Sequence, residues 1–133
     1  MASLHYSHKK IITGNGLFTI MLRCPKQIEA GGTIRFSSYF KHQRDGPVNP
    51  TGLSCKVYEG QQMATVLDTL TTYQDIYGTG SYFADWNCPS GTGSGSNYYV
   101  VWAGSYQSKG TLTSEPVQAT QVFRIVNPTS KVE

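Results

Sequence analysis

The sequence predicts an all-β fold, an antiparallel β-sandwich of about seven short strands preceded by an N-terminal β-hairpin arm. No segment shows apolar residues recurring at the helical period, whereas runs of alternating apolar and polar residues return about every ten to fifteen residues. Fourteen glycines and 12% aromatic residues match the needs of strands joined by tight turns. A chain of 133 residues is long enough for one domain with one hydrophobic core.

The chain begins with two strand-like segments, residues 4–13 and 17–23, on either side of Gly14-Asn15-Gly16. Glycine and asparagine tolerate positive φ, so this triplet predicts a hairpin turn. In the second segment Phe18, Ile20 and Leu22 share one face, and the opposite face is also fairly apolar. We therefore expect a strand that is covered on both sides or that meets a partner.

The remaining strands are predicted from alternation between turn signals. They cover residues 33–41, 52–58, 63–70, 81–87, 97–104 and 117–126. Large side chains recur on one phase of these strands, and Trp86 and Trp102 both follow other apolar residues two positions earlier. We expect both tryptophans to fill the interior of the sandwich.

Three glycine-, proline- or serine-rich stretches separate these strands and are predicted to be loops: residues 42–51, 89–96 and 105–115. The stretch 89–96 is rich in glycine and serine, so we interpret it as a flexible loop. The predicted organisation is an N-terminal arm at 1–27, a sandwich at 28–127 and a polar tail at 128–133.

The net charge of +3 is unevenly distributed. Residues 1–56 contain eight Lys/Arg and two acids, whereas residues 57–133 contain three Lys/Arg and six acids. The basic half is either a solvated face or a surface for an acidic partner. Because no basic run exceeds two residues, direct nucleic-acid binding is not expected. The sequence shows neither a signal-peptide pattern nor a membrane-length apolar run, so we expect a soluble chain made in the cytoplasm, with no membrane partner.

No catalytic constellation is visible in the sequence. His5 and His8 fall on opposite faces of an extended segment, and we expect these two and His42 to be exposed or to cap turns. Asp85 points away from the tryptophan face and is expected to be solvated or to pair with a cross-strand cation. We therefore predict a protein that is not an enzyme, with no catalytic residues, no cofactor and no metal site.

The three cysteines, Cys24, Cys55 and Cys88, are odd in number and form no metal-binding spacing. We expect them to be reduced, buried thiols. A bridge between Cys55 and Cys88 is the alternative for a protein that ends up outside a cell.

Three segments of the second half carry a resemblance. They read Gly80-Ser81-Tyr82-Phe83-Ala84-Asp85-Trp86-Asn87-Cys88-Pro89, Asn97-Tyr98-Tyr99-Val100-Val101-Trp102 and Gln121-Val122-Phe123-Arg124-Ile125-Val126. They resemble the C-terminal half of immunoglobulin-like and fibronectin-like domains, and residues 30–36 resemble an early strand of such domains. Domains of this kind without a signal peptide are similar to structural proteins of tailed-bacteriophage virions. The resemblance implies an immunoglobulin-like sandwich and a capsid decoration, neck or tail component located in the virion.

From this resemblance and the apolar arm we expect a non-enzymatic assembly protein that contacts other virion proteins or copies of itself. The interface candidates are Tyr6, Ile11, Phe18, Ile20 and Leu22. The alternative is a carbohydrate-binding or adhesion module with a surface glycan as its ligand. Its platform candidates are Tyr39, Tyr58, Tyr99 and Tyr106.

Overall fold

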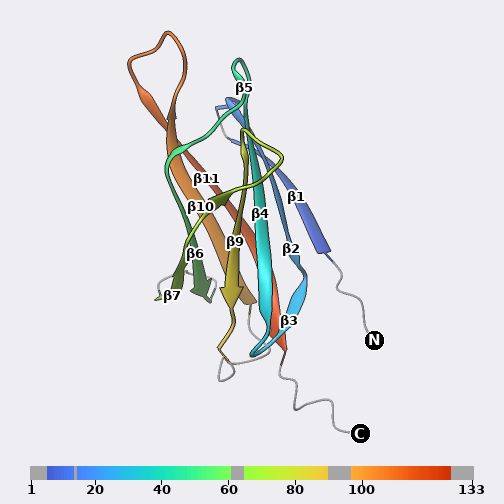
Figure 1. Cartoon of the computed structure of the whole chain (residues 1–133). Coiled ribbons are helices and arrows are strands. Elements are labelled where there is room, and N and C mark those ends of the chain that lie inside the picture. Colours follow the sequence, from blue (N-terminus) through green and yellow to red (C-terminus); the bar gives the residue numbers. More distant parts are fainter. Residues whose placement is uncertain (1–5, 14, 61–64, 90–96, 127–133) are drawn as a thin grey trace, which may run out of the picture.

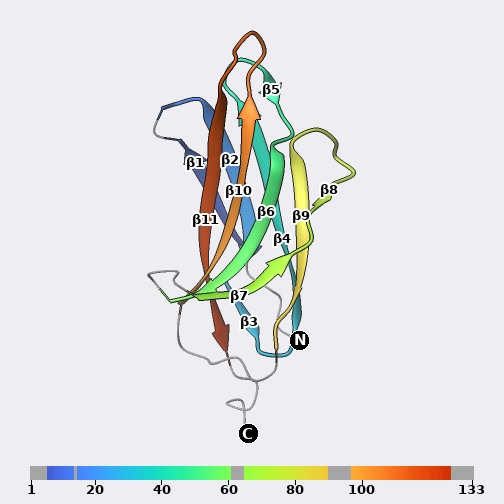
Figure 2. The same cartoon turned by 90° about the vertical axis from the view of Figure 1, so that its left-hand side faces the viewer.

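The protein is an all-β sandwich of two sheets packed face to face (Figures 1 and 2). The computed structural model describes residues 6–13, 15–60, 65–89 and 97–126, and none of these residues is helical. The predicted fold class is therefore confirmed. None of the described residues belongs to a helix capable of crossing a membrane.

The first sheet, sheet A, has six strands in the order β1-β2-β4-β9-β8, with β5 paired to β4. Every pairing in sheet A is antiparallel. The strands are β1 (Tyr6–Ile12), β2 (Phe18–Pro25), β4 (Thr33–His42), β5 (Gly46–Pro47), β8 (Tyr73–Gln74) and β9 (Ser81–Asn87).

The second sheet, sheet B, has five strands in the order β3-β11-β10-β6-β7. All its pairings are antiparallel except the short parallel pairing of β3 with the end of β11. Figure 2 shows β11, β10 and β6 lying in front of β2 and β4 of the other sheet. The strands are β3 (Gln27–Glu29), β6 (Thr51–Glu59), β7 (Thr65–Leu70), β10 (Asn97–Gln107) and β11 (Ser114–Val126).

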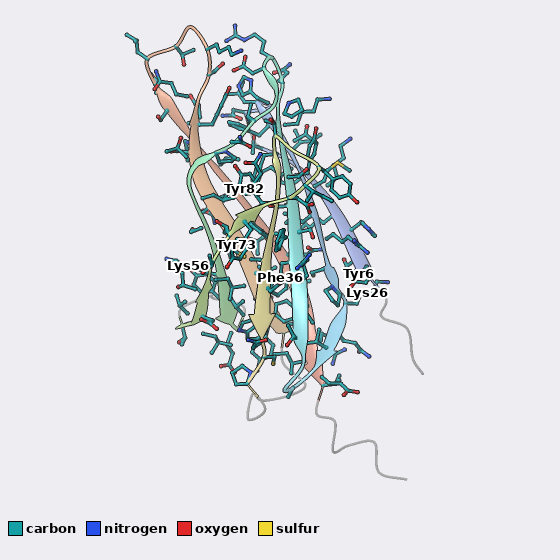
Figure 3. The ribbon with its side chains drawn as sticks, in the orientation of Figure 1. Tyr6, Lys26, Phe36, Lys56, Tyr73 and Tyr82 are labelled. Carbon is teal, nitrogen blue, oxygen red and sulfur yellow. The ribbon has the colours of Figure 1, made fainter. Side chains whose placement is uncertain are left out.

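The core fills the space between the sheets and is rich in aromatic rings. Phe123 of sheet B has its ring centroid 5.3 Å from that of Phe36 and 5.9 Å from that of Trp86, both in sheet A (Phe36 is labelled in Figure 3). Tyr98 stacks on Phe123 from the same sheet at 6.0 Å. Trp86 and Trp102 are each only 1% exposed, which confirms the prediction that both tryptophans are core residues.

The N-terminal segment is part of the sandwich, which corrects the predicted separate arm. A hairpin does form, with Tyr6–Ile12 paired to β2, but β2 also pairs along β4. Phe18, Ile20 and Leu22 are 1%, 0% and 2% exposed and belong to this chain's own core. Sheet B packs against the face of β2 that carries these residues, so the three side chains are not free to contact a partner.

Two long polar side chains close the side of the sandwich between β1 and β11. The amide Nε2 of Gln121 donates to the carbonyl of Ser7 at 2.9 Å, and Nζ of Lys9 donates to the carbonyl of Thr120 at 3.0 Å. Gln121 is only 2% exposed, so its hydrogen bond satisfies a buried amide. We call this pair of contacts the side latch.

The three cysteines are free and buried, as expected for reduced thiols. Burial raises the pKa of Cys24 to about 12 and raises that of Cys55 as well, because a thiolate is poorly solvated in the core. Both thiols are therefore protonated and unreactive at neutral pH.

The β10–β11 hairpin is longer than predicted. Its register continues to Gln107 opposite Ser114, so the ends of the predicted loop 105–115 are strand. The short strands β3, β5 and β8 were not predicted. Of the glycine- and serine-rich loop 89–96, residues 90–96 lie outside the described residues, as does the predicted tail at 128–133.

Candidate binding groove on the outer face of sheet A

A groove of about 480 Å³ lies on the outer face of sheet A. Its residues come from two cross-strand rows. One row runs His8, Arg23, Ser37, and the next runs Lys10, Met21, Tyr39, Ser81. Residues opposite each other in an antiparallel sheet point to the same face, so β1, β2, β4 and β9 together form the floor and one wall. Asp75 and Tyr77 from the β8–β9 loop also line this groove. We call it the sheet A groove.

The hollow follows from the sizes of the side chains in these rows. Ser37 is short and lies on β4, the central strand of the sheet, and the equally short Ser81 ends the second row on β9. Longer side chains, including Arg23 and Tyr39, flank them. Met21 projects from β2 into the same space and is 52% exposed. A sheet face that carries short side chains beside long ones is hollow where the short ones lie.

Basic side chains line one wall of the sheet A groove. His8, Lys10 and Arg23 are all exposed and come from the hairpin of β1 and β2. The guanidinium of Arg23 lies 4.1 Å from the ring centroid of Tyr6, which holds it in a cation–π contact (Tyr6 is labelled in Figure 3). Among the described residues, neither Lys10 nor Arg23 has a carboxylate within ion-pair distance.

An ion pair lies farther along the same face, beyond the groove. Arg35 donates to both carboxylate oxygens of Asp85, at 2.7 and 3.0 Å, and its guanidinium also lies 4.0 Å from the ring centroid of Phe83. Asp85 therefore points outward and pairs with a cross-strand cation, which is one of the two alternatives predicted for it. Because the two charges cancel, this pair adds no net charge to the face.

The loop that supplies Asp75 and Tyr77 is tightly fixed by its backbone. The amide of Gly80 donates to Oδ1 of Asn49 at 2.9 Å, and the carbonyl of Gly80 accepts from the amide of Phe40 at 2.9 Å. Gly80 has φ of +90°, and a Cβ there would lie 2.7 Å from the carbonyl oxygen of Phe40. Only glycine fits this position, and the fixed loop holds Tyr77, 83% exposed, beside the groove.

The other two predicted interface residues lie on β1, Tyr6 on the outer face and Ile11 on the inner face. Tyr6 is half-buried under Arg23, and Ile11 is partly buried against the core. Whether either contacts a partner stays a prediction.

The four predicted platform tyrosines do not form one surface. Tyr39 lies in the sheet A groove, whereas Tyr58 and Tyr99 face each other on the outer side of sheet B. The hydroxyl of Tyr106 donates to Asp45 at 2.7 Å, and its ring packs edge-on against Phe18 at 6.0 Å. Tyr106 is thus held by the fold and offers no free ring face of the kind predicted.

A cluster around Asp45 joins two loops at one end of the sandwich, where the β4–β5 turn meets the β10–β11 hairpin (Figure 1). One carboxylate oxygen of Asp45 accepts from the hydroxyl groups of Tyr106 and Ser108 and from the amide of Lys109. The buried ring of His42 accepts the amides of Arg44 and Asp45 at Nδ1, at 3.1 and 3.2 Å. His42 therefore caps a turn, as predicted, and the contacts of this cluster hold loops in place.

These hydrogen bonds lower the pKa of Asp45, with the Tyr106 hydroxyl as the largest cause. A lowered pKa in the folded state stabilises the fold above the ordinary aspartate pKa of about 3.9, and this stabilisation is lost as the pH falls through the folded-state value. We expect the stability difference between wild type and Asp45→Asn to be complete above about pH 5 and to shrink as the pH falls below the ordinary aspartate pKa of about 3.9. Tyr106→Phe, which keeps the ring contacts, should show a weaker pH dependence. Urea unfolding at several pH values measures the free energy of unfolding of each protein. The same pH dependence for wild type, Asp45→Asn and Tyr106→Phe would contradict the prediction.

No three His, Cys, Asp or Glu side chains gather closely enough to hold a metal ion within the described parts of the chain. His8 is exposed on β1, and His5 lies outside the described residues.

Comparisons with known proteins extend no further than the fold. Neither the protein-family models nor the curated proteins give a match. Among solved structures, the neutral ceramidase from Pseudomonas aeruginosa is similar with a TM-score of 0.52 and 14% identity, over 77% of this chain and 18% of that chain. A copper-bound variant of Campylobacter jejuni P19 is similar with a TM-score of 0.49 and 10% identity, over 90% of this chain and 96% of that chain. Neither is a phage protein, so the resemblance to virion proteins gains no support from them.

Sequence reasoning did not find the sheet A groove as a site. Its members come from four strands and one loop, and their cross-strand register is not visible in a single sequence. A partial signal was present, because Lys10 and His8 are two residues apart, as are Met21 and Arg23. Residues with that spacing on a strand share a face.

Proposed function

We propose that this chain is a non-enzymatic assembly module that binds a protein partner through the sheet A groove. The observation that carries the proposal is the groove wall, where Lys10 and Arg23 have no carboxylate partner among the described residues, beside exposed Met21 and Tyr77. Arginine, methionine and tyrosine are the residue types enriched in protein interfaces.

The sequence adds the proposed setting. The resemblance of residues 28–126 to immunoglobulin-like and fibronectin-like domains, and of such domains to virion structural proteins, favours a capsid decoration, neck or tail component of a bacteriophage particle, located in the virion. Other virion proteins or copies of this chain are then the proposed partners.

A second candidate function rests on sheet B. Tyr58 and Tyr99 lie opposite each other, with Val66 and Val122 completing the row across four strands. Val66 and Val122 are 44% and 45% exposed, so the row forms an uncharged, partly aromatic strip. Such a strip favours stacking on a sugar ring, as in a carbohydrate-binding or adhesion module.

The test compares three tagged chains in cells that produce the protein: wild type, Arg23→Glu and Tyr99→Ala. Co-purified proteins are identified by mass spectrometry, and thermal melting verifies that each variant is folded. We expect a partner that is recovered with wild type and Tyr99→Ala and is lost with Arg23→Glu, because charge reversal in the groove repels an acidic surface.

Each outcome decides one part of the proposal. Recovery of capsid, neck or tail proteins supports the virion setting, and recovery of partners with no relation to a particle contradicts it. A partner set that Arg23→Glu leaves unchanged overturns the role of the groove. If the wild type binds a glycan and Tyr99→Ala abolishes that binding, carbohydrate binding by sheet B replaces partner binding by the groove as the proposed function.

A further inference from the structure

The basic side chains of the sheet A groove have a regular spacing that limits what can bind there. His8 and Arg23 are opposite each other in one cross-strand row, and Lys10 lies in the next row along β1. Neighbouring rows on one face of a sheet are about 6.5–7 Å apart, since they are separated by two residues. The strand positions that carry Arg23 and Lys10 are therefore about 7 Å apart along the strand direction.

An extended peptide has the same spacing. Its alternate side chains point to one side and are also about 6.5–7 Å apart. Acidic residues at alternate positions of such a peptide therefore have the same spacing as the two cross-strand rows that contain Arg23 and Lys10, and the peptide backbone can stay extended. Ionised pairs of this kind are strong hydrogen bonds, and a carboxylate accepts two of them from one guanidinium.

The rest of the groove favours a peptide over a uniformly charged chain. Met21, Tyr39 and Tyr77 line the space between the basic wall and the loop, so the ligand must also offer apolar groups. Asp75 lies among these lining residues and would repel a closely spaced row of phosphates or sulfates. Nucleic-acid binding depends on many phosphate contacts, and this groove supplies few cations for them.

We propose that the sheet A groove binds an extended acidic segment of a partner protein, with alternating carboxylates facing Arg23 and Lys10 and an apolar side chain between Met21 and Tyr77. This inference rests on the proposed function and specifies the chemistry of the partner. The carboxylates supply charge complementarity, and the apolar residue covers the exposed part of the groove.

The experiment measures fluorescence anisotropy of a labelled nonapeptide in which Glu alternates with Ser around a central Phe. Competitors are the same peptide with Gln in place of Glu, an oligothymidylate of similar length and a heparin fragment. Protein variants are Lys10→Glu and Arg23→Glu, with Lys56→Glu as the matched control. Lys56 lies on β6 of the other sheet, away from the groove (Figure 3).

We expect the Glu peptide to bind the wild type and Lys56→Glu equally, and to lose at least about tenfold in affinity with Lys10→Glu or Arg23→Glu. Binding should weaken as salt is added. Equal binding of the Gln peptide, an equal loss with Lys56→Glu, or tighter binding of oligothymidylate or heparin overturns the inference. No binding of the Glu peptide overturns it too.

The two proposals fail in different ways. If co-purification of a partner depends on Arg23 but the acidic peptide does not bind, the partner chemistry is wrong and the assembly function stands. If neither the co-purification of a partner nor the binding of the acidic peptide depends on Arg23, both proposals are wrong.

Discussion

Replacing Phe123 with alanine is expected to destabilise the protein by about 3–5 kcal/mol, which is a large part of the roughly 5–15 kcal/mol typical of a domain. Phe123 is 1% exposed, and its ring lies within 6.0 Å of the ring centroids of Phe36, Trp86 and Tyr98. Its removal leaves a cavity where both sheets meet, and rigid aromatic neighbours cannot collapse to fill it. Urea unfolding monitored by tryptophan fluorescence measures the loss.

Val122→Ala is the matched control for this prediction. Val122 precedes Phe123 on β11 but points to the outer face of sheet B and is 45% exposed. We expect this substitution to cost less than about 1 kcal/mol, because little packing is lost on an exposed strand face. Similar costs for the two substitutions would show that Phe123 is not central to the core.

Ile20→Ala is expected to destabilise the protein by about 2–5 kcal/mol. Ile20 is 0% exposed, and β2 pairs with both β1 and β4, so its side chain is enclosed by the sandwich. If residues 1–27 formed a separate arm, truncating Ile20 would weaken partner binding and leave the stability of the sandwich unchanged. Thermal or urea unfolding of the isolated chain therefore distinguishes the two arrangements.

The neighbouring residue again supplies the control. Met21 faces outward and is 52% exposed, so Met21→Ala should change the free energy of unfolding by less than about 1 kcal/mol. A monomer that is destabilised as little by Ile20→Ala as by Met21→Ala would restore the arm interpretation.

The fold class and the core were predictable because alternation reports directly on burial. Ile34, Phe36 and Phe40 share the inner face of β4, as their spacing predicts, and all are buried. Trp86 and Trp102 follow the same rule. Most inward positions of such a strand are apolar, although Ser38 and His42 are buried polar exceptions on β4, so the alternation is visible without knowledge of the neighbouring strands.

The place of the N-terminal hairpin was not predictable in the same way. The apolar residues Phe18, Ile20 and Leu22 share one face of the strand, which indicates that this face is buried. The sequence does not indicate whether it is buried against this chain or against a partner. The extension of β10 and β11 beyond the core was also missed. Tyr106 is only partly buried there, and Gln107 and Ser114 are exposed and held mainly by backbone pairing, so no apolar alternation marks them.

The groove itself depends on tertiary structure. Lys10, Met21, Tyr39 and Ser81 are far apart in the sequence and meet only because their strands pair in one register. The sequence did show an excess of positive charge in residues 1–56, and part of that excess lies on this face. What one sequence cannot show is which of several scattered cations share a face.

The side latch also affects how copies of this chain behave when they are concentrated. Beyond its short pairing with β3, the outer edge of β11 has no strand partner among the described residues. Such an edge invites another chain to add a strand and continue the sheet without limit. Lys9 occupies the Thr120 carbonyl on this edge, and Pro116, four residues earlier, has no N–H to offer there. Both features oppose edge-to-edge growth at β11, so this edge is protected against forming a continuous sheet between copies of the chain.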